Sequence, residues 1–135
     1  MIQTQTILKV ADNSGAKTVK CIGFVDTHSC ARIGDCIIVS VRSLSRAGAK
    51  DGSKVNAGKT KAVIKKGQIF KALVIRTKQG ILNRKYGHKL FFEENSVILI
   101  NNQGNLVGSR IFGPITRELR VKNFRNILSY SDRIL

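Results

Sequence analysis

Apolar residues occur along the chain in short β-branched and aliphatic runs that end at Gly, Asn or Asp, rather than at the 3.6-residue spacing of a helix. This pattern predicts a mostly β protein. Asp12-Asn13-Ser14-Gly15 supplies turn chemistry between the first two runs, which therefore form a hairpin with Lys17 at its tip. The predicted strands cover residues 5–10, 18–25, 35–41, 68–77 and 96–100.

The fourth predicted strand contains four consecutive apolar residues, Ala72-Leu73-Val74-Ile75. Because successive side chains of a strand point to opposite faces, this run is buried on both faces or bends around a barrel corner. After the fifth strand, Leu106-Val107 offers a short returning strand. Five or six short strands at this spacing predict an all-β fold, a small closed barrel.

The apolar spacing changes near the C-terminus, where residues 114–130 are expected to form short helices. Pro114 suits the first helical position, where its missing N–H costs nothing, and the first helix is expected over 114–120. Ile115 and Leu119 stand at i, i+4 and are expected to form the buried face of this helix. Arg117 and Arg120 then project together into solvent. Helical spacing at i, i+3 and i+4 recurs at Phe124, Ile127 and Leu128.

Composition adds a strong cationic character to this folded domain. Lys and Arg number 24 against 8 Asp and Glu, a formal charge of +16, in a chain that is 42% hydrophobic. Its 135 residues are enough for one domain, residues 1–135. Such a surplus of positive charge predicts a dense polyanion as partner, and nucleic acid is the first choice. No apolar run approaches the roughly 18 residues that span a bilayer, so no membrane is expected.

Basic residues gather in turns and loops, where phosphates can approach the backbone closely. The segment around residues 45–60 is a basic loop rich in Gly, Ala, Ser and Lys, and it is expected to become ordered on a phosphate backbone. Aromatic residues make up only 6% and Trp is absent, which favours recognition of shape and backbone over base stacking. The candidate RNA-binding residues are Lys17, Arg46, Lys50, Lys54, Lys59, Lys61, Lys65, Lys66, Lys71, Arg76, Lys78, Arg84 and Lys85.

Nucleotide-binding and metal-binding motifs are less well supported. Residues 52–60 resemble a phosphate-binding P-loop, but the spacing between the glycines fails by one residue and no helix pattern follows. Four side chains could in principle bind zinc, but their spacing lacks the paired arrangement of zinc sites, and two of the cysteines fall inside predicted strands. These four are Cys21, His28, Cys30 and Cys36.

Catalysis is likewise not indicated. Glu93-Glu94 are neighbours that a strand would point to opposite faces, and no Gly-x-Ser-x-Gly elbow presents a nucleophile. No catalytic residue, metal or cofactor is therefore expected.

Four stretches resemble the L-fourteen family of large-subunit ribosomal proteins. The first, residues 65–78, has a Lys-Lys-Gly turn leading into an apolar strand that ends Arg-Thr-Lys. The others are 1–3 with 10–16, 92–95 with 99–102, and 108–120, in the order of the family. The resemblance implies a five-stranded barrel with short C-terminal helices. It also implies binding to large-subunit ribosomal RNA, contacts with small-subunit RNA across the subunit interface, and neighbouring ribosomal proteins.

The same resemblance implies that a ribosome-silencing factor can dock on the C-terminal region. By matching motif, the subunit-interface or factor-docking residues are Ser109, Arg110, Arg117 and Arg120. Two departures from the family stand out: Tyr86 replaces the usual Asp, Asn or Ser, and the 45–60 loop is longer than in a typical bacterial member.

The function expected from all this is a non-catalytic structural constituent of the large ribosomal subunit. The alternative is a free β-barrel module that binds nucleic acid outside the ribosome. Usage rich in Lys, Ile and Asn, together with the inserted loop, favours a mitochondrial ribosome over a plastid or bacterial one.

Overall fold

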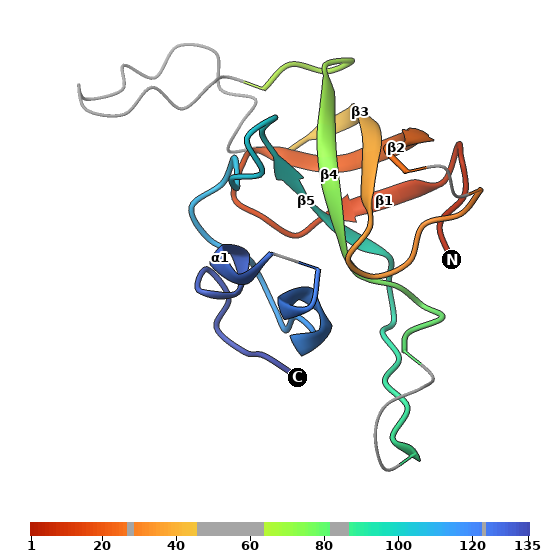
Figure 1. The fold of residues 1–135 in the computed structure, drawn as a ribbon. Coiled ribbons are helices and arrows are strands. Elements are labelled where there is room, and N and C mark those ends of the chain that lie inside the picture. Colours follow the sequence, from red (N-terminus) through yellow and green to blue (C-terminus); the bar gives the residue numbers. More distant parts are fainter. Residues whose placement is uncertain (27–28, 46–63, 82–86, 123) are drawn as a thin grey trace.

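The computed structural model describes residues 1–26, 29–45, 64–81, 87–122 and 124–135. Five strands form a closed barrel in the order β1-β2-β3-β4-β5 (Figure 1). Their bounds are β1 Ile7–Val10, β2 Ala16–Phe24, β3 Cys36–Leu44, β4 Ile69–Arg76 and β5 Ser96–Ile100. The predicted all-β barrel is thus confirmed, with each strand close to its expected position. In the described ranges no helix is long and apolar enough to cross a membrane.

One parallel contact closes the barrel. All other neighbouring strands run antiparallel, whereas β1 and β5 pair in parallel through Lys9 with Ser96 and Val10 with Val97. The Ala11 N–H extends this seam by donating to the Val97 carbonyl at 2.9 Å. A closed barrel leaves no unpaired sheet edge, and it encloses a core.

β5 and residues 72–75 of β4 are buried on both faces, as the consecutive apolar run of the fourth strand predicted. Inward-facing Ala72, Val74, Val97 and Leu99 join the core inside the barrel. Their outward-facing neighbours join a second core outside it, formed with the C-terminal segment, residues 108–135. These neighbours are Leu73, Ile75, Ile98 and Ile100.

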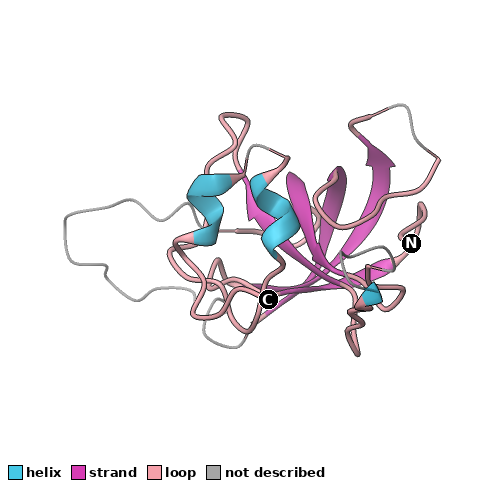
Figure 2. Cartoon of the chain, turned by 60° about the horizontal axis from the view of Figure 1, so that its bottom comes forward, coloured by secondary structure: helices cyan, strands magenta, loops and turns pink. Residues whose placement is uncertain are grey.

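The C-terminal segment covers one flank of the barrel with two short helical turns that lie side by side (Figure 2). They are the 3-10 helix η2, Arg117–Arg120, and the α-helix α1, Arg125–Leu128. Four of the segment's apolar side chains are at most 2% exposed, and burial of such a side chain stabilises the fold by about 1.5–3 kcal/mol. They are Ile111, Ile115, Leu119 and Ile127.

The prediction of a helix over 114–120 is wrong at its start, because the backbone of Ile115 is already paired with the end of the chain. Its N–H donates to the Arg133 carbonyl at 3.0 Å, and its carbonyl accepts from Leu135 N–H at 2.8 Å. Thr116 is accordingly extended, with φ −94° and ψ 145°. Only the single turn of η2 remains helical. The short return expected at Leu106-Val107 is present as a bridge between Leu106 and Ile100.

A buried carboxylate ties the first hairpin to β5. Asp12 is 5% exposed, and its two oxygens accept from the backbone N–H groups of Ser14 and Leu99, both at 2.8 Å. The first bond shapes the turn and the second crosses to β5. Burial raises the pKa of Asp12, while these hydrogen bonds oppose the rise.

Asn13, next to it, holds the segment that follows β5. Its Oδ1 accepts from Ser109 N–H at 2.7 Å and from Arg110 N–H at 3.2 Å, and its Nδ2 donates to Ser109 Oγ at 2.8 Å. The approach is so close that a Cβ on Gly108 would lie 2.7 Å from Asn13 Oδ1. The turn Asp12 to Gly15 therefore acts as a joint between the barrel and the C-terminal segment.

We predict that Asp12→Ala lowers the free energy of unfolding by about 2–4 kcal/mol, because it leaves the N–H of Leu99 buried without an acceptor and frees that of Ser14. Chemical denaturation of the two proteins measures this difference. Asp132→Ala is the matched control, since that carboxylate is 61% exposed and its ion pair with Arg110 is worth at most about 1 kcal/mol. Equal losses of unfolding free energy in the two variants would show that Asp12 does not tie the hairpin to β5.

The raised pKa of Asp12 also sets the direction of a pH effect. Between its ordinary value of 3.8 and its raised value, the folded protein binds more protons at this group than the unfolded chain does. Stability from this group therefore increases as the pH falls through that window and decreases as the pH rises. We expect the stability advantage of the wild type over Asp12→Asn to shrink with rising pH there. A stability difference between the two proteins that stays constant with pH would contradict the raised pKa of Asp12.

Candidate nucleic-acid interface

The Lys-Lys-Gly turn presents two exposed ammonium groups at the entrance to β4. Gly67 has φ 85° at the third position of this turn, where a type II turn favours glycine. The turn is held rigidly: Lys65 N–H donates to the Gln68 side chain at 3.1 Å, and Gly67 N–H to the Val41 carbonyl at 2.8 Å. Lys65 and Lys66 are both exposed, so their charges point into solvent from a fixed backbone.

Three more candidate lysines lie exposed on or beside the barrel. Lys71 is the third residue of β4, and Lys78 follows the end of that strand. Lys17 was expected at the tip of the first hairpin, which is wrong in detail, because it is the second residue of β2. The turn itself is taken by the joint residues Asp12 to Gly15.

Seven of the candidate RNA-binding residues lie outside the described residues. Most of them belong to the basic loop expected over residues 45–60. They are Arg46, Lys50, Lys54, Lys59, Lys61, Arg84 and Lys85.

Arg76, the last residue of β4, has a different setting from the lysines. It is half-buried, and its Nη2 donates to the carbonyl of Phe112. Burial lowers the pKa of its guanidinium, and the charge of Glu94 opposes this. A Cβ on Gly113 would stand 3.1 Å from Arg76 Nη1, so the guanidinium lies directly against the C-terminal segment. Arg76 thus joins β4 to that segment.

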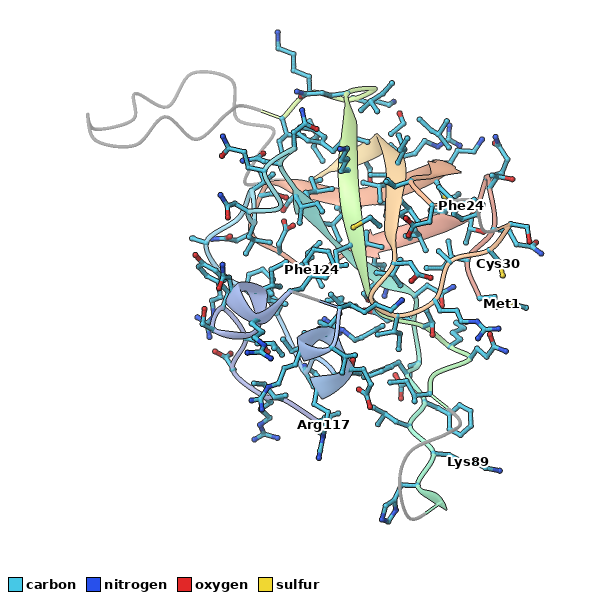
Figure 3. All side chains as sticks on the ribbon, in the orientation of Figure 1. Met1, Phe24, Cys30, Lys89, Arg117 and Phe124 are labelled. Atoms are coloured by element: carbon cyan, nitrogen blue, oxygen red, sulfur yellow. The ribbon has the colours of Figure 1, made fainter. Side chains whose placement is uncertain are left out.

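The proposed interface residues of the C-terminal segment lie on the surface. Arg117 and Arg120 are exposed at the two ends of η2, while Leu119 between them is fully buried. In a 3-10 helix residues i and i+3 eclipse each other, so both guanidinium groups project to the same side. Figure 3 shows Arg117 pointing away from the barrel. Their expected exposure is confirmed.

Ser109 and Arg110 lie beside the joint. Ser109 is exposed and bonded to Asn13, and Arg110 Nη2 is 2.9 Å from Asp132 Oδ2. Both partners of this ion pair are about 60% exposed at their side chains, so it leaves the Arg110 guanidinium accessible to a partner.

Acidic side chains in the described ranges are largely engaged by the fold. Asp12 is buried in the joint, Glu94 pairs with Lys9, and Asp35 pairs with Lys122. The Lys122 ion pair fastens the turn after η2 to the loop before β3, where the Lys122 side chain crosses closely over Gly34. Few carboxylates are therefore left to neutralise the exposed lysines of the turn and of β4.

Sequence reasoning missed Lys89, an exposed residue on the extension between β4 and β5. The extension is bridged by Ile81 and Leu90, which exchange two backbone hydrogen bonds at 2.8 and 3.0 Å. Gly80 precedes the bridge, and a Cβ there would stand 1.8 Å from the Leu90 carbonyl oxygen. Figure 3 shows Lys89 on this extension, well away from the helical turns. The signal available was its place four residues after Lys85, in the basic stretch between the fourth and fifth strands.

Within the described ranges, no three His, Cys, Asp or Glu side chains gather as they would around a metal ion. Cys21 is buried in the core of the barrel, and burial raises the pKa of its thiol. Cys30 and Cys36 are half-buried free thiols. His28 lies outside the described residues.

The arrangement combines a closed barrel, a C-terminal segment on its flank and fixed turns that carry exposed cations. The family model of ribosomal protein L14p/L23e matches residues 1–135, the whole length of the chain. The chain belongs to this family. An L14p/L23e protein has a structural role in the large ribosomal subunit, with ribosomal RNA and ribosomal proteins as its partners.

Stretches that resemble L14p/L23e proteins correspond to particular contacts of the fold. The Asp-Asn-Ser-Gly turn forms the joint, and the Lys-Lys-Gly turn fixes two cations before β4. The stretch 108–120 supplies the outer core and η2.

Arg76 yields a prediction that separates a structural cation from a solvent-exposed one. We expect Arg76→Ala to lower the free energy of unfolding by about 1–3 kcal/mol, because it removes the guanidinium that donates to the Phe112 carbonyl. Lys78→Ala, two residues further on, should change it by no more than about 0.5 kcal/mol. Thermal or urea unfolding measures both, and equal stabilities would show that Arg76 does not fasten the segment.

Proposed function

We propose that this chain is a non-catalytic constituent of the large ribosomal subunit that binds ribosomal RNA by neutralising phosphates. The observation that carries this proposal is the set of exposed lysines on fixed turns and strands, in a chain of net charge +16 whose described carboxylates are mostly engaged by the fold. Such charges attract any phosphate backbone and carry no sequence information. Specificity then comes from the shape of the RNA.

The proposed RNA contacts are the candidate basic residues of the barrel, the basic loop and the extension. In the described ranges Lys65, Lys66 and Lys71 are the first choice because all three are exposed around one strand. Arg76 is a weaker contact, since its guanidinium already donates to the Phe112 carbonyl.

The C-terminal segment is the proposed subunit-facing surface. Arg117 and Arg120 together form a paired donor site for phosphate oxygens of small-subunit RNA, which would make them part of an intersubunit bridge. The same surface, with Ser109 and Arg110, is the proposed docking place of a ribosome-silencing factor. The proposed compartment is a mitochondrial ribosome, on the grounds of the Lys-, Ile- and Asn-rich composition.

The rival function is a free barrel that binds nucleic acid outside the ribosome. Sedimentation of a cell extract distinguishes the two, because a ribosomal constituent travels with the large subunit and a free module stays near the top of the gradient.

We predict a steep salt dependence of binding to large-subunit RNA. If the protein neutralises about six to ten phosphates, affinity should fall by roughly three to five orders of magnitude between about 50 and 200 mM salt on the scale of duplex DNA. Filter binding or fluorescence anisotropy at several salt concentrations measures the slope. An affinity nearly independent of salt would rule out phosphate neutralisation as the mechanism.

We predict that Arg117→Ala with Arg120→Ala weakens subunit association or factor binding while changing stability by no more than about 0.5 kcal/mol per site. Arg32→Ala with Arg42→Ala is the control, because it removes the same charge from exposed sites outside the C-terminal segment. The readouts are subunit association and thermal unfolding. Unchanged association together with a loss of several kcal/mol in stability would show that these arginines hold the fold instead.

A further inference from the structure

The outer face of the barrel has an open hollow where the C-terminal segment does not cover it. The hollow has a volume of about 410 Å³ and lies where β3, β4 and β5 run side by side. Ligand sites in proteins have volumes of the same order. Its lining includes Ile38, Ile69, Lys71, Ile100, Asn101 and Asn102.

The strand register explains this lining. Lys71 of β4 pairs with Ile38 of β3 on one side and with Ile100 of β5 on the other. Residues directly opposite in a sheet share a face, so an apolar–cationic–apolar row crosses three strands. Ile69 stands two residues before Lys71 on the same face and is 63% exposed.

We propose that this hollow binds one unstacked nucleotide of an RNA chain, with its base against Ile38 and Ile69 and its phosphate at Lys71. The inference rests on the proposed RNA-binding function and goes beyond phosphate neutralisation. Apolar side chains can cover the face of a base, and an ammonium group binds its phosphate as a point charge. The amides of Asn101 and Asn102 offer both donors and acceptors to the edge of a base.

Charge favours a nucleotide over an apolar side chain of a neighbouring protein as the occupant. No carboxylate lines the hollow, and within the described part of the chain Lys71 forms no ion pair. Lys65 and Lys66 stand in the turn directly before Ile69, where they can bind neighbouring phosphates of the same RNA strand. An RNA chain therefore meets cations both inside the hollow and at its rim.

The first experiment follows the isoleucine methyl groups of the full-length chain by NMR. Titration with AMP, CMP, GMP or UMP should shift the methyl signals of Ile38 and Ile69 and leave those of Ile7 and Ile22, exposed on other strands, unchanged. Ribose 5-phosphate, which has the phosphate without the base, should leave all four unchanged. Equal shifts by the sugar phosphate, or none with any nucleotide, would overturn the proposal.

The second experiment compares two double variants in binding to large-subunit RNA. Ile69→Ala with Lys71→Ala removes the apolar wall and the cation of the hollow. Ile7→Ala with Lys20→Ala is the matched control, because Ile7 is 57% exposed and pairs directly with Lys20 on the other side of the barrel. We expect the first pair to weaken binding by roughly fivefold to tenfold more than the control. Thermal unfolding of both variants checks that they remain folded.

The outcomes separate the two proposals. Equal weakening by the two pairs would overturn the nucleotide site and leave phosphate neutralisation standing. Failure of the wild type itself to bind the RNA would overturn the proposed function. Photo-crosslinking in the assembled large subunit completes the test: a nucleotide adduct on residues 69–71 supports the site, whereas a crosslink to a neighbouring protein shows that a protein occupies the hollow.

Discussion

One buried carboxylate, that of Asp12, reinforces the closure of the barrel. It accepts hydrogen bonds from its own turn and from Leu99 of β5, and so adds a side-chain tie to the backbone pairing of β1 with β5. Burial of a charge is costly, and the two hydrogen bonds offset part of that cost. Asn13 extends the same contact to Ser109 and thereby fixes where the C-terminal segment leaves the barrel.

Two-sided burial sets β5 and residues 72–75 of β4 apart from the other strands. One face of each strand completes the inside of the barrel, and the other requires a cover, which Ile111, Ile115 and Leu119 provide. The surfaces proposed for function are the parts of the barrel and of the C-terminal segment that this packing leaves exposed. Arg117 and Arg120 lie outside because Leu119 between them points inward, and the hollow at Lys71 exists because the cover ends before it reaches that part of β4.

The strands could be predicted from the sequence because β-branched runs bounded by turn residues are a local signal, and the run 72–75 even indicated burial on both faces. The start of the C-terminal helix could not, since the backbone of Ile115 pairs with Arg133 and Leu135, a contact between segments that local spacing does not report. Arg76 shows that the role of a candidate site residue can also depend on a contact between distant segments. Its charge suggested a phosphate contact, but only the folded chain places its guanidinium against the Phe112 carbonyl.

The parallel seam between β1 and β5 has a consequence for the order of folding. It joins segments about as distant as Asp12 and Leu99, which are 87 positions apart, so the barrel cannot close before β5 has been synthesised. Until then β1 has an unpaired edge, the kind of surface through which nascent chains aggregate. Lys9 sits on that edge, and the large positive charge makes copies of the chain repel one another. Positive charge on and around this edge therefore opposes association between chains while the barrel is still open.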